Sequence, residues 1–149
     1  MSVSEQEIVP GLVVQLDTAT VRALGGAQTN AELSGSADRA VLGTVDFLVV
    51  GVDLSRTTCT AVPLFAKSAV GNQPLDASKK SGGDASWTAT EHWFSRWQHW
   101  RIPLAHVEAA SAGEATEPLG RRRYAAADRS ALDDIKNWEI RNRAPYRSA

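Results

Sequence analysis

The chain of 149 residues carries 16 Lys and Arg against 17 Asp and Glu, and 43% of its residues are hydrophobic. This is the composition of an ordinary globular domain, and it rules out a disordered or collagen-like chain. The single cysteine, Cys59, rules out an internal disulfide framework and a zinc site made of several cysteines. No apolar run approaches the ~20 residues of a membrane span, and the acidic N-terminus does not resemble a secretory signal. We therefore expect one cytoplasmic domain over residues 1–149.

The charge is unevenly distributed along the chain. Residues 96–149 carry ten basic and seven acidic residues, a net charge of +3, whereas residues 1–95 carry six and ten, a net charge of −4. Three of the basic residues, Arg121, Arg122 and Arg123, are consecutive. Such a run could bind phosphate, because Arg presents paired planar donors. Arginines on a solvated surface or near a helix C-terminus explain the run equally well, so charge alone does not predict nucleic-acid binding.

The chain begins with strand and loop signals. An apolar run over residues 8–16, opened by Pro10-Gly11, predicts a first strand after a turn. Residues 17–40 are rich in small and polar residues and predict a long loop. A short helix is expected near residues 18–24, ended by the glycine pair at residues 25 and 26.

The clearest strands follow at residues 44–52 and 57–65. Both are dense in β-branched and aromatic residues, and the turn residues 53–56 between them predict a hairpin. The first of the two is almost continuously apolar, which favours a central strand. Pro63 lies near the end of the second, where its missing N–H does least harm.

The second half predicts fewer elements. Residues 66–86 predict a polar loop, residues 100–107 a further strand, and residues 109–120 a small, acidic and exposed segment. Apolar residues at helical spacing predict a C-terminal helix within residues 128–143, packed on the domain, with Ser130 and Asp133 as a capping box. The expected fold is mainly β (α+β), a small and strongly bent barrel with long loops and a C-terminal α-helix.

Three short motifs in order resemble the MazF/PemK-type toxin family. They are Pro10–Val14, Phe47–Val50, and Ala61–Leu64 followed by Lys67-Ser68, so the resemblance covers roughly residues 8–70. It implies an SH3-like barrel, an RNA substrate, metal-independent endoribonuclease activity without a cofactor, a bacterial toxin–antitoxin setting, a homodimer and an antitoxin-like protein partner. The sequence departs from the family at Phe65 and Ala66, which stand where a Thr-Ser pair is usual, so the catalytic site could be degenerate.

RNA cleavage of this kind needs a proton acceptor for the 2′-hydroxyl, a proton donor for the leaving oxygen and a cation for the phosphorane charge. The resemblance points to Arg39, or Arg22, as the loop arginine of the family. Lys67 is a second cation, and Ser68 supplies a hydroxyl from a shifted position. His92, His99 and His106 are the histidines that could move a proton, with His92 the first choice. The candidate catalytic set is Arg39, Lys67, Ser68 and His92.

Residues 91–101 are unusually aromatic. If a helix persists there, Trp93, Trp97 and Trp100 share one face. Such a face could stack nucleic-acid bases while Arg96 and Arg101 hold phosphates; filling the core of a small barrel is the competing explanation. The candidate ligand-binding residues are Trp93, Arg96, Trp97, His99 and Arg101.

Two other functions, a binding module and a metal-dependent hydrolase, are alternatives to the nuclease. A non-catalytic SH3-like module could recognise a peptide or a nucleic acid through the same Trp and Arg residues. A metal-dependent hydrolase would need more ligands than His92 and His99, so we expect no metal. Cys59 lies in an apolar strand, where we expect a buried and inert thiol.

Overall fold

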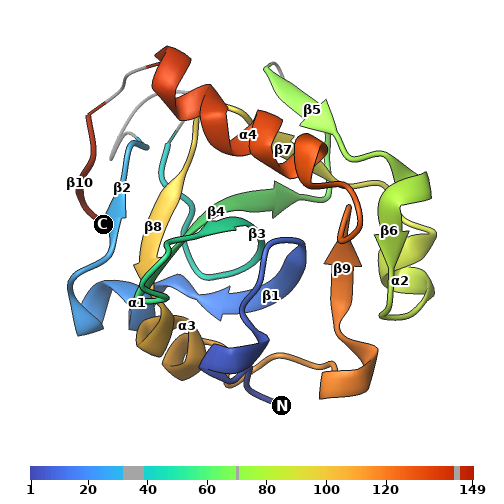
Figure 1. Cartoon of the computed structure of the whole chain (residues 1–149), viewed down its shortest axis with the longest axis horizontal. Coiled ribbons are helices and arrows are strands. Elements are labelled where there is room, and N and C mark those ends of the chain that lie inside the picture. Colours follow the sequence, from blue (N-terminus) through green and yellow to red (C-terminus); the bar gives the residue numbers. More distant parts are fainter. Residues whose placement is uncertain (32–38, 70, 143–144) are drawn as a thin grey trace.

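The computed structural model describes residues 1–31, 39–69, 71–142 and 145–149. Its strands and helices alternate irregularly along the chain (Figure 1). The strands are β1 (Leu12–Asp17), β2 (Gln28–Thr29), β3 (Thr44–Val52), β4 (Thr58–Phe65), β5 (Asn72–Pro74), β6 (Lys80–Ser81), β7 (Trp93–Ser95), β8 (Trp100–Pro103), β9 (Arg122–Tyr124) and β10 (Arg147–Ser148). The α-helices are α1 (Thr18–Leu24), α2 (Ala85–Thr88), α3 (Leu104–Ala110) and α4 (Arg129–Asn142), and short 3-10 turns are η1 (Glu5–Glu7), η2 (Ala77–Lys79) and η3 (Pro118–Gly120).

All the described ladders are antiparallel, and the expected mainly β class is confirmed. The strands follow the order β10-β2-β8-β4-β3-β1-β9-β6. Strand β4 divides its second edge between two partners: Thr58 to Ala61 pair with β8, and Leu64 and Phe65 pair with β7. Strand β7 in turn pairs with β5. The sheet therefore splits beyond the middle of β4.

The segment from Asn72 to Ser81 connects the branch of β7 and β5 to strand β9. At its start β5 pairs with β7, and the Leu75 N–H donates to the His92 carbonyl at 2.8 Å. At its end β6 pairs with β9, and the Lys79 carbonyl accepts from the Ala125 N–H at 2.9 Å. Residues 72–81 therefore connect β7, which pairs with the end of β4, to β9, which pairs with β1.

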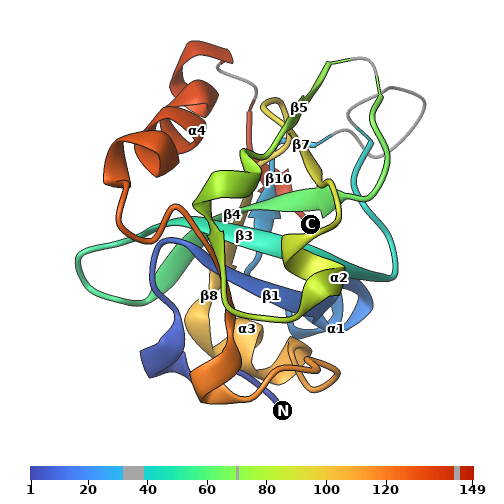
Figure 2. The same ribbon diagram turned by 90° about the vertical axis from the view of Figure 1, so that its right-hand side faces the viewer.

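Two apolar clusters occupy the two faces of β1, β3 and β4. Side chains alternate along a strand, so Phe47 and Val49 enter one cluster while Leu48 and Val50 enter the other. Helices α1 and α3 cover the first face, and α4 covers the second (Figure 2). This two-sided burial explains why β3 is apolar almost without a break, as expected of a central strand.

Several boundaries agree with the sequence. Strand β3 and helix α1 have the expected bounds, and α1 ends at Gly25, whose φ of 73° suits glycine. The first strand starts later than expected because Pro10 and Gly11 form a turn. Gly11 has a φ of 97°, and a Cβ there would lie 2.9 Å from the Tyr124 carbonyl oxygen, so this turn requires glycine.

Two predictions for residues 91–107 were wrong. The stretch after His92 is not helical, because β7 and β8 occupy it with a turn between them. The strand expected over residues 100–107 ends at Pro103, which lacks an N–H to continue the ladder. Helix α3 begins at the next residue, and Leu104, Val107 and Ala110 pack its inner face against the first cluster.

The segment expected to be exposed at residues 109–120 is partly buried. Ser111 is fully buried and its hydroxyl accepts from the Val3 N–H at 2.8 Å. Glu114 is only 2% exposed because its carboxylate accepts hydrogen bonds from Gln15, Thr116 and Arg122. Composition could not predict the contacts with Val3 and Gln15, since these two residues come from the distant N-terminal part of the chain.

Helix α4 packs over β3 through Leu132 and Ile135, as the expected C-terminal helix should. Its cap differs from the expected one. The Asp128 carboxylate accepts from the Ala131 N–H at 3.2 Å and from the Ser130 hydroxyl at 2.7 Å, so Asp128 and not Ser130 is the N-cap residue. Within the described ranges, no helix combines the length and the apolar character that a bilayer crossing requires.

Candidate functional site: a groove beside the end of strand β4

An open groove of about 770 Å³ lies where β4 ends and β3 begins. Its walls come from the residues just before β3, the start of β3, the chain leaving β4, β5 and the residue before β7. The apolar lining consists of Val41, Leu42, Val45, Leu64, Phe65, Ala66 and Ala69. The polar lining consists of Thr44, Asp46, Lys67, Ser68, Asn72 and His92. An apolar trough with a few polar groups is typical of a small-ligand or nucleotide site.

Three of the four candidate catalytic residues line this one groove. Lys67 and Ser68 follow shortly after β4 and are exposed, whereas His92 is half-buried and precedes Trp93, the β7 residue that pairs with Phe65. The fourth, Arg39, is exposed and lies two residues before Val41 in the chain, but it is not among the residues that line the groove. Residues 32–38 lie outside the described residues. The sequence placed these side chains in three separate segments, and the fold of β4 and β7 brings Lys67, Ser68 and His92 to one groove.

The groove rim is held by side chains that pack around Trp100. The Gln98 amide donates to the Arg39 carbonyl at 3.1 Å, while its oxygen accepts from the Val41 N–H at 3.2 Å and from the Trp100 indole at 2.9 Å. Arg22 donates to the Val41 carbonyl at 2.6 Å and lies over the Trp100 ring. The Gln98 side chain that makes these contacts is itself buried. Arg22 thus supports the rim from beneath.

His92 has a close cationic neighbour. The Lys80 Nζ lies 2.8 Å from Nδ1 of His92. The His92 ring also packs at a tilt against the Trp87 ring, with the two centroids 4.9 Å apart. Burial, together with the Lys80 charge, holds the pKa of His92 below its ordinary value. Burial likewise lowers the pKa of Lys80. The histidine of the groove is therefore neutral at physiological pH.

Asp46 is the carboxylate of the groove. One of its oxygens accepts from the Arg122 guanidinium at 2.9 Å, and the same Arg122 nitrogen donates to Glu114 at 3.0 Å. Burial disfavours the charge of Glu114, but the Thr116 and Gln15 N–H groups outweigh it and keep the pKa of Glu114 below its ordinary value. Arg122 is accordingly committed to two carboxylates, and it fixes Asp46 at the groove edge.

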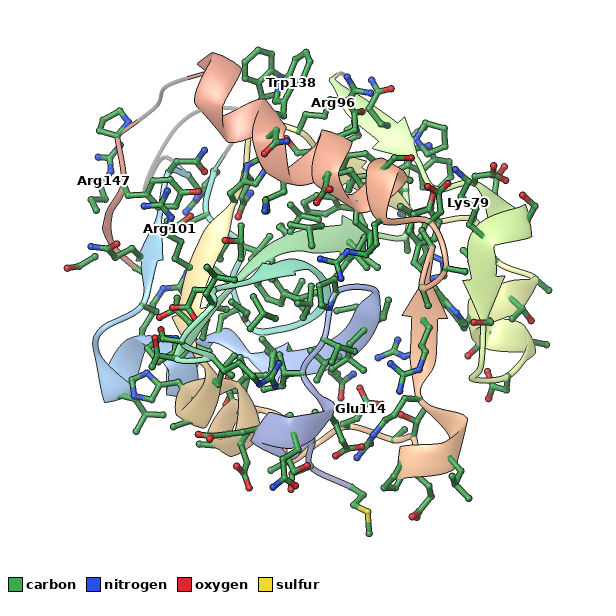
Figure 3. The ribbon with its side chains drawn as sticks, viewed as in Figure 1. Lys79, Arg96, Arg101, Glu114, Trp138 and Arg147 are labelled. Carbon is green, nitrogen blue, oxygen red and sulfur yellow. The ribbon has the colours of Figure 1, made fainter. Side chains whose placement is uncertain are left out.

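A second exposed feature is formed by Trp97, Arg96 and Trp138. Trp97 is 38% exposed, and its ring meets that of Trp138 edge to face at 5.8 Å. The Arg96 guanidinium lies 4.7 Å from the centre of the Trp138 ring and 3.8 Å from an Asp134 oxygen. Figure 3 shows Arg96, from the turn between β7 and β8, beside Trp138 of α4. We call these three residues the Trp97 surface.

The remaining candidate binding residues do not join the Trp97 surface. Trp100 is fully buried in the first cluster, and Trp93 is half-buried opposite Phe65 of the groove. His99 is fully buried, and its Nε2–H donates to the Ile135 carbonyl at 2.9 Å. Arg101 stacks on Tyr146 at 3.7 Å, away from Arg96 and Trp138 (Figure 3).

The other titratable candidates lie apart from the groove lining. His106 is on α3, where it packs near Gly26. Cys59 is buried in β4, as expected, and burial raises its pKa to about 12, so the thiol is inert. Among the residues that the structure describes, no three His, Cys, Asp or Glu side chains are grouped as metal ligands.

The sequence did not indicate several side chains that shape these sites. Asp46, Lys80, Gln98 and Trp138 each act through a contact with a residue far away in the chain. The alternation within β3 places Asp46 on a face, but no spacing rule relates Trp97 to Trp138. Comparisons with family models, with curated proteins and with solved structures give no match for this chain.

Proposed function

We propose that the protein is a MazF/PemK-like toxin-type protein that cuts RNA without a metal ion. The observation that carries this proposal is the groove, which combines Lys67, Ser68 and His92 at the end of the strand that the resemblance identifies. The proposed SH3-like barrel is supported by residues 72–81, which run from β5, paired with β7, to β6, paired with β9. Phe65 and Ala66 replace the usual Thr-Ser pair, so the hydroxyl of this site is that of Ser68.

The reaction requires little more than these side chains. The ribose 2′-oxygen attacks the adjacent phosphorus, a P–O bond forms, and the bond to the 5′-oxygen of the next nucleotide breaks. A 2′,3′-cyclic phosphate forms, and the leaving 5′-oxygen takes a proton from a water molecule to become a 5′-hydroxyl; the resulting hydroxide is neutralised by the proton taken from the 2′-hydroxyl. Lys67 and Arg39 offset the charge of the phosphorane, and Ser68 and His92 donate hydrogen bonds to its oxygens. Asp46, whose second oxygen has no hydrogen-bond partner among the described residues, is the candidate acceptor for the 2′-hydroxyl proton.

Incubation of the purified protein with a long mixed-sequence RNA, with and without EDTA, tests the proposal. We expect discrete cleavage that resists EDTA and leaves 2′,3′-cyclic phosphate ends. Replacement Lys67→Ala or Arg39→Ala should lower the rate about 10²- to 10³-fold, the usual effect of one electrostatic group at a transition state. Lys79→Ala is the matched control, because Lys79 pairs with Asp128 away from the groove. Absence of cleavage, or cleavage that EDTA abolishes, refutes the proposal.

The same resemblance implies a homodimer and an antitoxin-like protein partner, and we include both in the proposal. The apolar lining of the groove suits a hydrophobic segment of such a partner. Light scattering after size-exclusion chromatography measures the oligomeric state directly. A monomer at all concentrations would remove the homodimer from the proposal.

A non-catalytic binding module is the second candidate function, and the Trp97 surface favours it. An exposed indole beside an arginine can stack a base or an aromatic side chain. Trp97→Ala should weaken the binding of a single-stranded oligonucleotide about tenfold or more, measured by fluorescence anisotropy, while circular dichroism stays unchanged. Unfolding of Trp97→Ala would show instead that Trp97 is needed for packing.

A further inference from the structure

Lys80 is surrounded by acceptors. Its ammonium group donates to the Trp87 carbonyl at 2.9 Å and to the Thr90 carbonyl at 2.5 Å, and it lies 2.8 Å from Nδ1 of His92. It also lies 4.4 Å from the centre of the Trp87 ring. An ammonium has three protons and no acceptor lone pair. These three partners therefore use all of its donors.

The third of these bonds decides which nitrogen of His92 carries the proton. Nδ1 lies 3.0 Å from the Thr90 carbonyl and 2.8 Å from Lys80, and it cannot donate to the first and accept from the second at once. An ammonium can only donate, so the contact with Lys80 is a hydrogen bond only if Nδ1 accepts, whereas the Thr90 carbonyl already has a donor in Lys80 and does not need Nδ1. Nδ1 must therefore be the acceptor, which leaves the proton of the neutral ring on Nε2.

The charges around His92 reinforce this state. Lys80 and Arg122 disfavour a positive imidazolium, and Asp46 favours it. Asp46 is itself paired with Arg122. The negative charge of Glu91 favours the charged form of Lys80, against the larger opposing effect of burial. The Trp87 ring covers part of the imidazole. His92 is also one of the residues that line the groove.

We propose that Lys80 is a positioning residue that holds His92 as a neutral imidazole with its proton on Nε2, so that the groove offers a fixed N–H donor to an oxyanion. His92 then binds a phosphate oxygen, and a different group must accept the 2′-hydroxyl proton. The identification of the oxyanion as an RNA phosphate rests on the proposed function. The tautomer of His92 does not.

Long-range ¹H–¹⁵N spectra of protein labelled with ¹⁵N-histidine test the proposal. The chain has three histidines, and His92→Gln assigns the relevant signals. In the natural protein we expect His92 to show an unprotonated Nδ1 and a protonated Nε2. In Lys80→Met we expect the proton to move to Nδ1, because the Thr90 carbonyl becomes its acceptor. The titration midpoint of His92 should rise in that variant, since the neighbouring positive charge is gone.

Lys79→Met is the matched control. It removes the same charge one residue earlier, where the ammonium pairs with Asp128 at 3.0 Å, and it should leave the tautomer and the midpoint of His92 unchanged. An Nδ1–H tautomer in the natural protein would overturn the proposal. An unchanged midpoint and tautomer in folded Lys80→Met would overturn it too.

Titration with inorganic phosphate tests the oxyanion, with sodium chloride at equal ionic strength as the reference. We expect the Nε2–H signal of His92 to shift with phosphate alone, and this shift to be lost in His92→Gln. No shift in the natural protein would contradict the donor role. A clear shift in a protein that does not cut RNA would refute the proposed nuclease and leave the positioning by Lys80 intact.

Discussion

Arg121 and Arg122 are neighbours in the chain and have different tasks. Arg121 is fully buried, with its guanidinium bound to the Glu7 carboxylate at 2.9 Å and to the carbonyls of Met1, Ser2 and Thr116. Neither a phosphate-binding surface nor a solvated one describes this residue, so both sequence interpretations of the run are wrong at Arg121. Its cost of desolvation is offset by these acceptors, and it fastens the N-terminal segment to the sheet.

Arg121→Ala should lower the free energy of unfolding by about 3–5 kcal/mol, because it leaves a carboxylate and several carbonyls without their partner. Urea denaturation followed by tryptophan fluorescence measures the change. Arg129→Ala, at the exposed start of α4, is the control and should change stability by less than ~0.5 kcal/mol. Equal effects of the two substitutions would show that burial of Arg121 has no energetic weight.

Glu7 makes this anchor dependent on pH. The Arg121 hydrogen bond, with smaller contributions from Ser4, lowers the pKa of Glu7 from 4.5 to about 2. A group whose pKa is depressed in the folded state contributes stability that is complete above 4.5 and is lost as the pH falls through about 2. Glu7→Gln should therefore lose less stability than the natural protein over this acidic range. Urea midpoints of both proteins, measured at several pH values, test this expectation. Parallel pH profiles of Glu7→Gln and the natural protein would contradict it.

At the scale of elements, the start of α4 depends on one carboxylate. Asp128 caps the helix and also pairs with Lys79 on η2, which ties α4 to the segment between β5 and β6. The Ser130 and Lys79 hydrogen bonds lower the pKa of Asp128 to about 2. The expected Ser130–Asp133 capping box marked the correct end of the helix but assigned the N-cap to the wrong residue. Asp128 precedes the first helical residue, whereas Ser130 follows it.

Asp128→Ala should cost about 1 kcal/mol of stability, the usual cost of losing an N-cap. Asp128→Asn keeps an oxygen for the Ala131 N–H and loses only a partly exposed ion pair, so we expect a loss below ~0.5 kcal/mol. Ser130→Ala should also have little effect. Thermal and urea unfolding of the three variants provide the measurement. A larger loss of stability in Ser130→Ala than in Asp128→Ala would show that Ser130 is the N-cap residue after all.

For the whole molecule, the two apolar clusters share the same strands. Because successive residues of β3 enter opposite clusters, neither cluster can come apart while the strand keeps its place. Trp100 reports on the first cluster and Trp87 on the second. The fold is therefore expected to unfold as one cooperative unit.

Leu104→Ala in the first cluster and Leu132→Ala in the second should each destabilise the protein by about 2–5 kcal/mol. Both leucines are almost completely buried. Each variant should show one transition, with coincident midpoints by fluorescence and far-ultraviolet circular dichroism. A fluorescence change that precedes the loss of dichroism in one variant would mean that its cluster melts separately.

The sequence was most informative where a pattern is local. The hairpin of β3 and β4, helix α1 and helix α4 all follow from apolar spacing and turn residues. It failed over residues 91–107, where aromatic spacing suggested a helix and the ladders to β4 impose strands. Lys67 and Ser68 could be proposed from their place after β4, whereas the pairing of Lys80 with His92 could not, because it joins strand β6 to the residue before β7 and no sequence pattern relates the two.

By itself, the sequence determined the mainly β class, the central strand pair and the helices at the two ends of the chain, because propensity, spacing and turn chemistry act within a few residues. Only the tertiary structure decided which tryptophans are buried, that Arg121 is an anchor, and that Lys67, Ser68 and His92 share one groove. These outcomes depend on contacts between distant segments. Burial and hydrogen bonding across such contacts outweigh local preference.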